Sequence, residues 1–289
     1  MEPEFTGNLV IAVDAKERSL DPLALGKLLA KTTAAPIVLV SVFPYDPLAD
    51  PGGDELTRVR DEARDILLEL AQELDLEVAN ARVIASNFAA RELQHVTEED
   101  ATAVIVVGST GRGPVGRLLP GGVGERLFAG SARPVAIAPR GYAERPAERL
   151  ERIGVAFDDS QESHRALAAG HFLARSSGAQ LRVISVFHRM AFGTIATLGT
   201  HGVSADELMR AELHRALDKA VADLDQEVSV EGRFLDGSPG EVLARESAEL
   251  DLLLTGSRGY GPRTAVLLGS TTQALTRTAL CPGLVLPRG

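Results

Sequence analysis

Two glycine-rich segments of the chain have the residue types and the spacing of a phosphate-binding loop. Residues 256–259 read Gly-Ser-Arg-Gly and are followed, after nine residues, by a Gly-Ser pair at 269–270. An earlier copy, Gly-Ser-Thr-Gly at 108–111, is followed after the same nine residues by a Gly-Gly pair at 121–122. Glycine lets an anion approach the backbone closely, so successive N–H groups and the start of a following helix can solvate phosphate oxygens. Because the pattern occurs twice at one spacing, the sequence predicts two phosphate sites.

The duplication extends beyond these loops. Residues 10–14 (VIAVD) correspond to residues 154–158 (GVAFD), each an apolar strand that ends in an aspartate, and Ser-Val-Phe occurs at 41–43 and again at 185–187. These pairs lie 144 residues apart whereas the glycine loops lie 148 apart, so a small insertion separates them. We therefore predict two copies of one domain, residues 1–146 and 147–289.

Within each half, short β-rich runs such as residues 38–43 and 181–187 alternate with helical patterns. The apolar residues of one predicted helix recur at helical spacing, at Leu56, Val59, Ala63, Ile66, Leu67, Leu70 and Leu74. Asp21 and Pro22 predict another helix start, as N-cap and first helical residue. This alternation predicts a parallel sheet with helices on both faces. Ligands of such sheets bind at the carboxyl ends of strands, where both aspartates and both glycine loops fall.

These motifs resemble the universal stress protein family, here as a tandem pair. The resemblance rests on the aspartate after the first strand, on GxxG, nine residues and Gly-Ser/Thr after the fourth, and on a short closing strand such as residues 281–286 (CPGLVL). It covers nearly the whole chain. It implies an α/β fold of two flavodoxin-like domains, of the adenine nucleotide α-hydrolase-like type, each a five-stranded parallel sheet in the order 3-2-1-4-5. In the nucleotide-binding branch of the family it implies an ATP site, with Mg²⁺ as a candidate companion ion.

The resemblance carries the family site onto this chain residue by residue. In the first half the site would comprise Ala12, Asp14, Val42, Val107, Gly108, Gly111, Gly121, Gly122 and Val123. In the second half it would comprise Ala156, Asp158, Val186, Thr255, Gly256, Gly259, Gly269, Ser270, Thr271 and Thr272. Asp158 is expected on the adenine or ribose side, and the glycines with Ser270 at the phosphates. The first half has Gly122 and Gly124 at the hydroxyl positions, so it loses side-chain donors there but keeps backbone N–H groups.

Three functions stay open at this stage. The first is a nucleotide-dependent regulatory protein of the stress response, whose output is contact with an unidentified protein partner. The second is a slow ATPase or another nucleotide-dependent enzyme. The Walker form GxxxxGK[ST] is absent and neither glycine loop holds a lysine, so any hydrolysis is expected to be slow. The loop arginines, Arg112, Arg117, Arg258 and Arg263, could contact a phosphate or point to solvent, and for Arg112 and Arg258 we favour solvent. The third function is a structural pair with vestigial nucleotide sites, which Gly122 and Gly124 favour for the first half alone.

Composition narrows the class of protein. A net charge of −10 argues against nucleic acid or an anionic membrane as partner, and we expect a cytoplasmic protein without a membrane span. The single cysteine, Cys281, is expected to be a buried small hydrophobe. His164 and His171 stand two helical turns apart, and we favour a helix surface over a metal site for them.

The closing strands, residues 135–138 and 284–286, are expected at sheet edges. In the family that the chain resembles, single domains pair through this strand, so we predict the same contact between the two halves within the chain. A homodimer of two chains stays open. The long connections at residues 44–53 and 189–204 either fold over the nucleotide or are surface loops.

Overall fold

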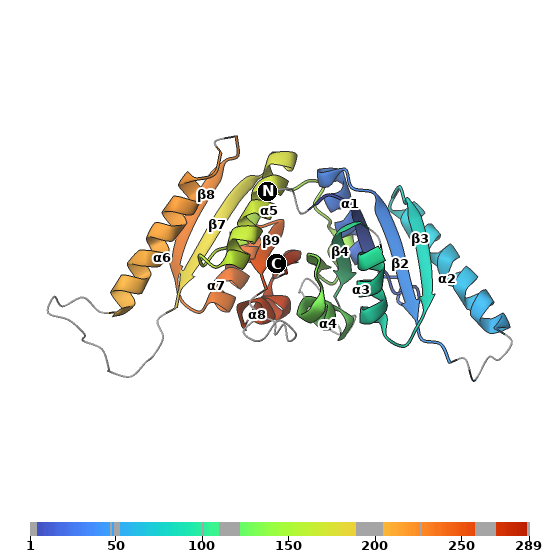
Figure 1. The fold of residues 1–289 in the computed structure, drawn as a ribbon. Helices are drawn as coiled ribbons and strands as arrows, with labels where there is room; N and C mark the ends of the chain where they lie inside the picture. Colours follow the sequence, from blue (N-terminus) through green and yellow to red (C-terminus); the bar gives the residue numbers. More distant parts are fainter. Residues whose placement is uncertain are drawn as a thin grey trace.

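The computed structural model describes residues 5–46, 48, 53–99, 101–109, 122–188, 205–225, 227–257 and 270–287. Figure 1 shows the two halves side by side, the first in blue to green and the second in yellow to red. Among the helices of these described residues, none is both long and apolar enough to cross a bilayer.

The first half alternates strands and helices in the predicted order. Its inner strands are continuous aliphatic runs, as expected for parallel strands that are covered on both faces. The elements are β1 (Asn8–Ala12), α1 (Asp21–Thr33), β2 (Ile37–Phe43), α2 (Asp54–Glu73), β3 (Asn80–Ala85), α3 (Ala89–Glu99), β4 (Thr102–Gly108), α4 (Gly122–Gly130) and β5 (Val135–Ala138).

The second half repeats this order after a linker that holds a short 3-10 helix, η1 (Tyr142–Glu144). A second 3-10 helix, η2 (Ser247–Glu249), precedes its fourth strand. The main elements are β6 (Arg152–Ala156), α5 (Gln161–Ser177), β7 (Gln180–Phe187), α6 (Ala205–Ala222), β8 (Val230–Asp236), α7 (Pro239–Glu246), β9 (Leu252–Gly256), α8 (Ser270–Thr278) and β10 (Gly283–Leu286).

All ten strands form one sheet, in the order β3-β2-β1-β4-β5-β10-β9-β6-β7-β8. Each half has the expected order 3-2-1-4-5, and neighbouring strands within a half are parallel, which confirms the α/β fold. The halves join where β5 and β10 pair antiparallel, with Ala136 opposite Leu284.

The predicted contact between the closing strands is therefore present within the chain. Each closing strand ends the five-stranded order of its own half, as expected, and their pairing places both at the centre of the joined sheet, with β3 and β8 at its edges. Every residue of β5 and β10 is buried, so neither strand could face solvent without exposing an aliphatic run. The structure therefore has one continuous sheet where the sequence predicted two. The domain boundary at residue 146 stays a prediction.

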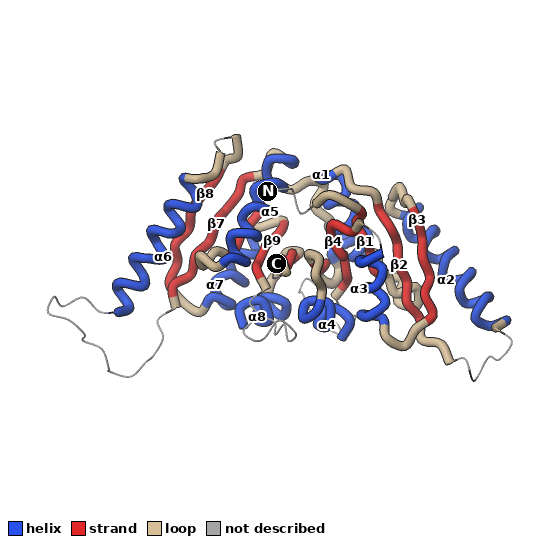
Figure 2. The backbone as a smooth tube through the Cα atoms, in the orientation of Figure 1, coloured by secondary structure: helices blue, strands red, loops and turns tan. Residues whose placement is uncertain are grey.

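The helices cover both faces of this sheet (Figure 2). Helices α1, α2, α5 and α6 pack in one core, which includes Leu67 and Leu217. Helices α3, α4, α7 and α8 pack in the other, which includes Leu93 and Leu243. The helical spacing predicted between residues 56 and 74 is confirmed by α2.

Asp21 does not make the N-cap bond predicted for it. Helix α1 begins at Asp21 itself, with Leu20 as the cap residue and no side-chain cap bond. The Asp21 carboxylate instead accepts hydrogen bonds from the backbone N–H groups of Gly141 and Ala143, at 2.8 and 2.9 Å. These donors belong to the start of η1, so Asp21 caps a turn of the linker. The prediction was wrong because capping patterns are read locally in a sequence, whereas this carboxylate meets its partners 120 residues away.

Arg165 occupies the position of α5 that corresponds to Asp21 in α1. Its Nη1 donates to the carbonyl oxygen of Pro287 at 2.8 Å, directly after β10. In each half a charged side chain thus hydrogen-bonds to the backbone that follows the closing strand, a carboxylate in the first half and a guanidinium in the second. The carboxylate accepts from backbone N–H groups, whereas the guanidinium donates to a backbone carbonyl oxygen.

Replacing Asp21 tests whether this carboxylate fastens the linker. Asp21→Ala is expected to lower the free energy of unfolding by about 1–3 kcal/mol, because two half-buried N–H groups lose their acceptor. Urea unfolding followed by circular dichroism measures the change. Asp65→Ala removes an exposed acid from α2 and is the control, with an expected effect within about 0.5 kcal/mol. Equal effects of the two substitutions would contradict the role of Asp21.

Candidate functional site

A cavity of about 400 Å³ lies at the carboxyl ends of β1, β2 and β4. Its lining includes seven of the nine residues predicted for the first-half nucleotide site, namely Ala12, Asp14, Val42, Val107, Gly108, Gly122 and Val123. The other two, Gly111 and Gly121, lie outside the described residues. Residues from three strands and the start of α4 therefore meet in one space.

The order of the sheet brings these segments together. β1 lies between β2 and β4 and is parallel to both, with Ile11 opposite Leu39 on one side and Val106 on the other. Parallel strands end in the same direction, so the residues that follow them meet at one edge of the sheet. The connection from β3 then brings α3 over this edge, and α3 supplies Ala89 and Leu93.

The cavity has an apolar part and a polar part. Its apolar lining comes from the strands and α3, as Ala12, Val40, Val42, Ala89, Leu93 and Val107. Its polar lining comes from the segments that follow β1 and β4, as Asp14, Glu17, Ser19 and Ser109. An apolar slot beside a few polar groups is suited to a flat ring system that carries a polar substituent.

The loop after β1 orients Asp14. One carboxylate oxygen, Oδ1, accepts hydrogen bonds from the backbone N–H groups of Lys16 at 2.9 Å and Glu17 at 3.4 Å. The turn closes when the Arg18 N–H donates to the Asp14 carbonyl at 3.0 Å, with Arg18 in the left-handed region at φ 48°. This local turn holds the carboxylate beside the cavity.

The start of α4 supplies the backbone donors. The helix begins at Gly122, and the first N–H groups of a helix have no partner within it. A Cβ built on Gly122 meets no atom of the described residues within 4 Å, so with respect to these residues this end of the helix is open. Because Gly122 also lines the cavity, an anion there could reach unpaired N–H groups and the positive end of the helix dipole.

The second half has the same arrangement of strands. Ala156 ends β6 and Val186 lies near the end of β7, and both pack beside the core that holds α7 and α8. Asp158 follows β6, and its Oδ1 accepts a hydrogen bond from the N–H of Ser160 at 3.1 Å. Ser160 in turn caps α5 by accepting from the Ser163 N–H at 3.2 Å. Gly259 and Gly269 lie outside the described residues, as does the side chain of Ser270.

Gly256, at the end of β9, and Thr272, in α8, have structural partners that the sequence did not predict. A Cβ on Gly256 would lie 2.6 Å from Cβ and 2.8 Å from the carbonyl carbon of Glu162, so this glycine lets α5 approach the strand. Thr272 is only 3% exposed, and its hydroxyl donates to the Gly256 carbonyl at 3.2 Å. In this conformation the hydroxyl proton of Thr272 is therefore used in a hydrogen bond to the backbone. A phosphate contact through Thr272 stays a prediction, as does one through Thr271 beside it.

Comparison with known sequences identifies the family. The sequence profile of the "Universal stress protein family" matches residues 6–139 and again residues 149–287. The chain belongs to the universal stress protein family. The family resemblance inferred from the glycine loops and the aspartates is therefore confirmed.

Two relatives from Mycobacterium tuberculosis are also universal stress proteins. One is 28% identical over 183 residues, which cover 63% of this chain and 61% of the relative. The other is 28% identical over 198 residues, or 68% of each chain. The chain thus spans less than two thirds of the length of the first relative.

A crystal structure supports the fold. It is a universal stress protein from Archaeoglobus fulgidus, which superposes with a TM-score of 0.72 over 99% of this chain and 100% of its own, at 22% identity. A similar structure from Pseudomonas aeruginosa has a TM-score of 0.63 at 18% identity. At this level of identity the similarity extends to the fold alone.

Sequence reasoning missed several residues that line the first-half cavity, among them Ser19, Pro22, Ala89 and Leu93. Pro22 lies 3.3 Å from a Cβ built on Gly108, so it forms the wall behind that glycine. The helical pattern of α3 could have shown that Leu93 faces inward. It could not have shown that α3 crosses back over the ends of β1 and β2.

The prediction of a buried cysteine is confirmed, whereas of the two histidines only His164 lies at the helix surface, with 52% of its side chain exposed against 16% for His171. His164 lies 2.8 Å from Asp159 and His171 lies 3.4 Å from Asp225, so each has its own carboxylate. The described residues contain no group of three potential metal ligands. Cys281 is buried, and burial raises the pKa of its thiol well above the usual range, which disfavours the nucleophilic thiolate.

Several predictions fall on residues that the structure does not describe. They concern the four loop arginines and the whole of the second long connection, namely Arg112, Arg117, Arg258, Arg263 and residues 189–204. These remain predictions from the sequence.

Alanine substitutions at two glycines test whether a side chain at each position would clash with its neighbours. Gly256→Ala is expected to lower the free energy of unfolding by about 1–3 kcal/mol, because the new methyl group meets the Glu162 backbone, which cannot rotate away. Gly122→Ala should leave stability unchanged or raise it by up to about 1 kcal/mol, because its methyl group enters free space at a helix start. Thermal and urea unfolding measure both. A larger loss for Gly122→Ala than for Gly256→Ala would contradict this assignment.

Proposed function

We propose that this universal stress protein binds an adenine nucleotide, with ATP as the ligand, and acts as a nucleotide-dependent regulatory protein in the stress response. The observation that carries the proposal is the first-half cavity, which combines an apolar slot, an oriented aspartate and an open helix start. Each of these three features matches one part of a nucleotide.

The apolar slot suits the adenine ring. Ala12, Val42 and Val107 line it from adjacent strands, and Leu93 closes it from α3. Burying a flat heteroaromatic ring against aliphatic side chains is favourable because it removes apolar area from water. Asp14 lies two residues beyond Ala12 and also lines the cavity, next to the proposed adenine position. Its carboxylate would therefore accept hydrogen bonds from ribose hydroxyls.

The open helix start suits the phosphates. Gly108 and Gly122 border the cavity at the end of β4 and the start of α4. The unpaired N–H groups of α4 would carry the negative charge without a lysine. Asp14 and Glu17 are the described carboxylates on the lining, and either could contribute to a Mg²⁺ that the triphosphate itself holds.

The second half is proposed as an equivalent site. Ala156, Asp158 and Val186 occupy the strand positions of Ala12, Asp14 and Val42. The sequence adds Ser270 at the start of α8, where the first half has Gly122. We therefore expect ATP in both halves.

A regulatory role fits the described lining better than catalysis. Phosphoryl transfer needs a cation at the developing charge and a residue that positions the nucleophile. Among the described residues that line the first-half cavity there is no lysine or arginine. In our proposal, occupancy of the sites by ATP in the cytoplasm alters the surface that an unidentified protein partner contacts. Two chains could also associate as a homodimer.

Nucleotide stoichiometry tests the proposal. The purified full chain is denatured, and released nucleotide is identified by chromatography, with two equivalents expected per chain. Isothermal titration of the nucleotide-free chain with MgATP should show two sites. Gly122→Leu should reduce this to one, because its side chain fills the first-half cavity at a position where a Cβ meets nothing.

Gly122→Ala is the matched control, since one methyl group leaves most of the cavity free. It should retain two sites. Asp14→Ala should weaken the first site about tenfold through the loss of charge-assisted hydrogen bonds. Two undiminished sites in folded Gly122→Leu would place the ligand elsewhere. A wild-type chain that binds no ATP and gains no thermal stability from it would favour a structural pair with vestigial sites.

A further inference from the structure

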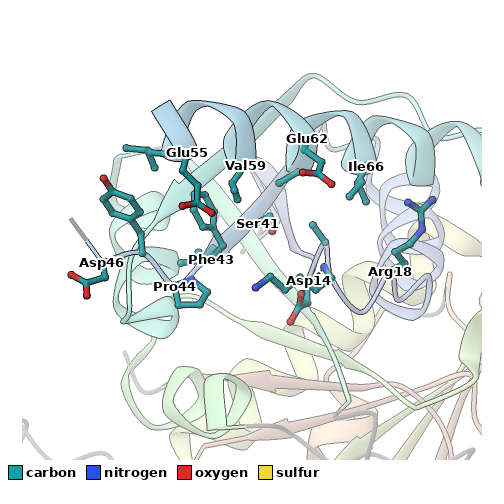
Figure 3. A pocket seen from close by; sticks show the side chains of 16 residues that line it. Asp14, Arg18, Ser41, Phe43, Pro44, Asp46, Glu55, Val59, Glu62 and Ile66 are labelled. Carbon is teal, nitrogen blue, oxygen red and sulfur yellow. Dashed lines mark hydrogen bonds between the residues drawn. The ribbon is translucent and has the colours of Figure 1, made fainter. Parts of the chain in front are cut away.

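A second and larger cavity, of about 620 Å³, lies on the other face of the first half, beneath α2. Its lining comes from α2, the end of β2 and the loop after β1. Figure 3 shows Ser41 and Phe43 facing this space from the strand, Glu55, Val59 and Glu62 facing it from α2, and Asp14 on the opposite side. We call it the α2 cavity.

The α2 cavity exists because only one end of α2 packs against the core. Towards the carboxyl end of the helix, Leu67 and Leu70 are at most 1% exposed. Leu56 and Val59 in the first turns of the helix are only half-buried, as is Ile66 further along, and all three line the cavity. The apolar stripe that continues into the core thus faces an open space over its first turns. An apolar ligand there would complete the burial.

Carboxylates outnumber cations around this apolar stripe. The lining contains Asp14, Asp46, Glu55 and Glu62, against Lys16 and Arg18. The Arg18 guanidinium is paired with Glu69 outside the cavity, at 3.3 Å. Arg58 lies between Glu55 at 3.7 Å and Glu62 at 3.3 Å and offsets one of these two negative charges, while both carboxylates remain more than 60% exposed. The mouth of the cavity is therefore acidic and accessible to a soluble cation.

We propose that the α2 cavity binds an organic cation, a small molecule with an apolar body and an ammonium group. The apolar body contacts Phe43, Val59 and Ile66, and the ammonium group lies at the mouth near Glu55 and Glu62. An organic anion of the same shape meets the same apolar walls but is repelled by the carboxylates.

The α2 cavity is separate from the proposed nucleotide site, although Asp14 and Val42 line both. Neither of these two residues is therefore used in the test. The proposal does not require nucleotide binding, and the titrations are done in the absence of nucleotide.

The test uses the full chain with isotopically labelled methyl groups and a matched pair of probes. 4-Phenylbutylammonium should cause saturable shifts at the Ile66 methyl resonance. 4-Phenylbutyrate has the same apolar skeleton with the opposite charge and should bind at least about tenfold more weakly. The methyl resonances of Ile153, in the core of the second half, should not move with either probe.

Two variants locate the site. Glu62→Gln should weaken binding of the ammonium probe about threefold, as expected for a partly exposed charge, and Asp65→Asn, which removes an exposed acid of α2 outside the lining, should not change it. Val59→Trp should abolish the saturable shift at Ile66 by filling the cavity, with an unchanged circular dichroism spectrum.

Three results would overturn the proposal. The first is a carboxylate probe that binds as tightly as the ammonium probe. The second is an Asp65→Asn variant that weakens binding as much as Glu62→Gln. The third is an Ile66 methyl resonance that neither probe shifts in the wild-type chain.

Discussion

The parallel pairing of β1 with strands on both sides is the constraint on which the candidate site depends. β2 and β4 are far apart in the sequence, yet each forms a hydrogen-bonded ladder with β1 in the same direction. Their carboxyl ends therefore meet beside Asp14. The start of α4 comes next along the chain after β4, and α3 reaches the cavity through the connection that follows β3. β6 has the same neighbours in the second half, in β7 and β9.

The antiparallel pairing of β5 and β10 makes one sheet from two halves. Both closing strands are fully buried aliphatic runs, so each needs a neighbour on its open side. Asp21 and Arg165 then hold the backbone that follows each of these strands, one as an acceptor and the other as a donor. The two halves thus have the same fold and pair through equivalent strands, but different side-chain groups hold the backbone after each of these strands.

The glycines of the two loops are needed for different structural reasons. Gly256 is required because the backbone of Glu162 occupies the place of its side chain. Gly122 has free space in that direction and lines the cavity. A motif that reads as one phosphate loop therefore combines a packing requirement at the end of the strand with an open helix start further on.

The sequence by itself determined the duplication, the strand and helix order, and the residues that end each strand, because these depend on local composition and on period. It also identified the family, because the glycine motif is defined by the number of residues between its glycines and can be recognised without a structure. Only the tertiary structure decided that Asp21 caps the linker and that Thr272 bonds to Gly256, because each bond joins segments that are distant in sequence. It alone placed Leu93 in the cavity, and it alone left the first turns of α2 facing an open space. Helical periodicity shows which residues share a face, but what that face meets depends on where the rest of the chain packs.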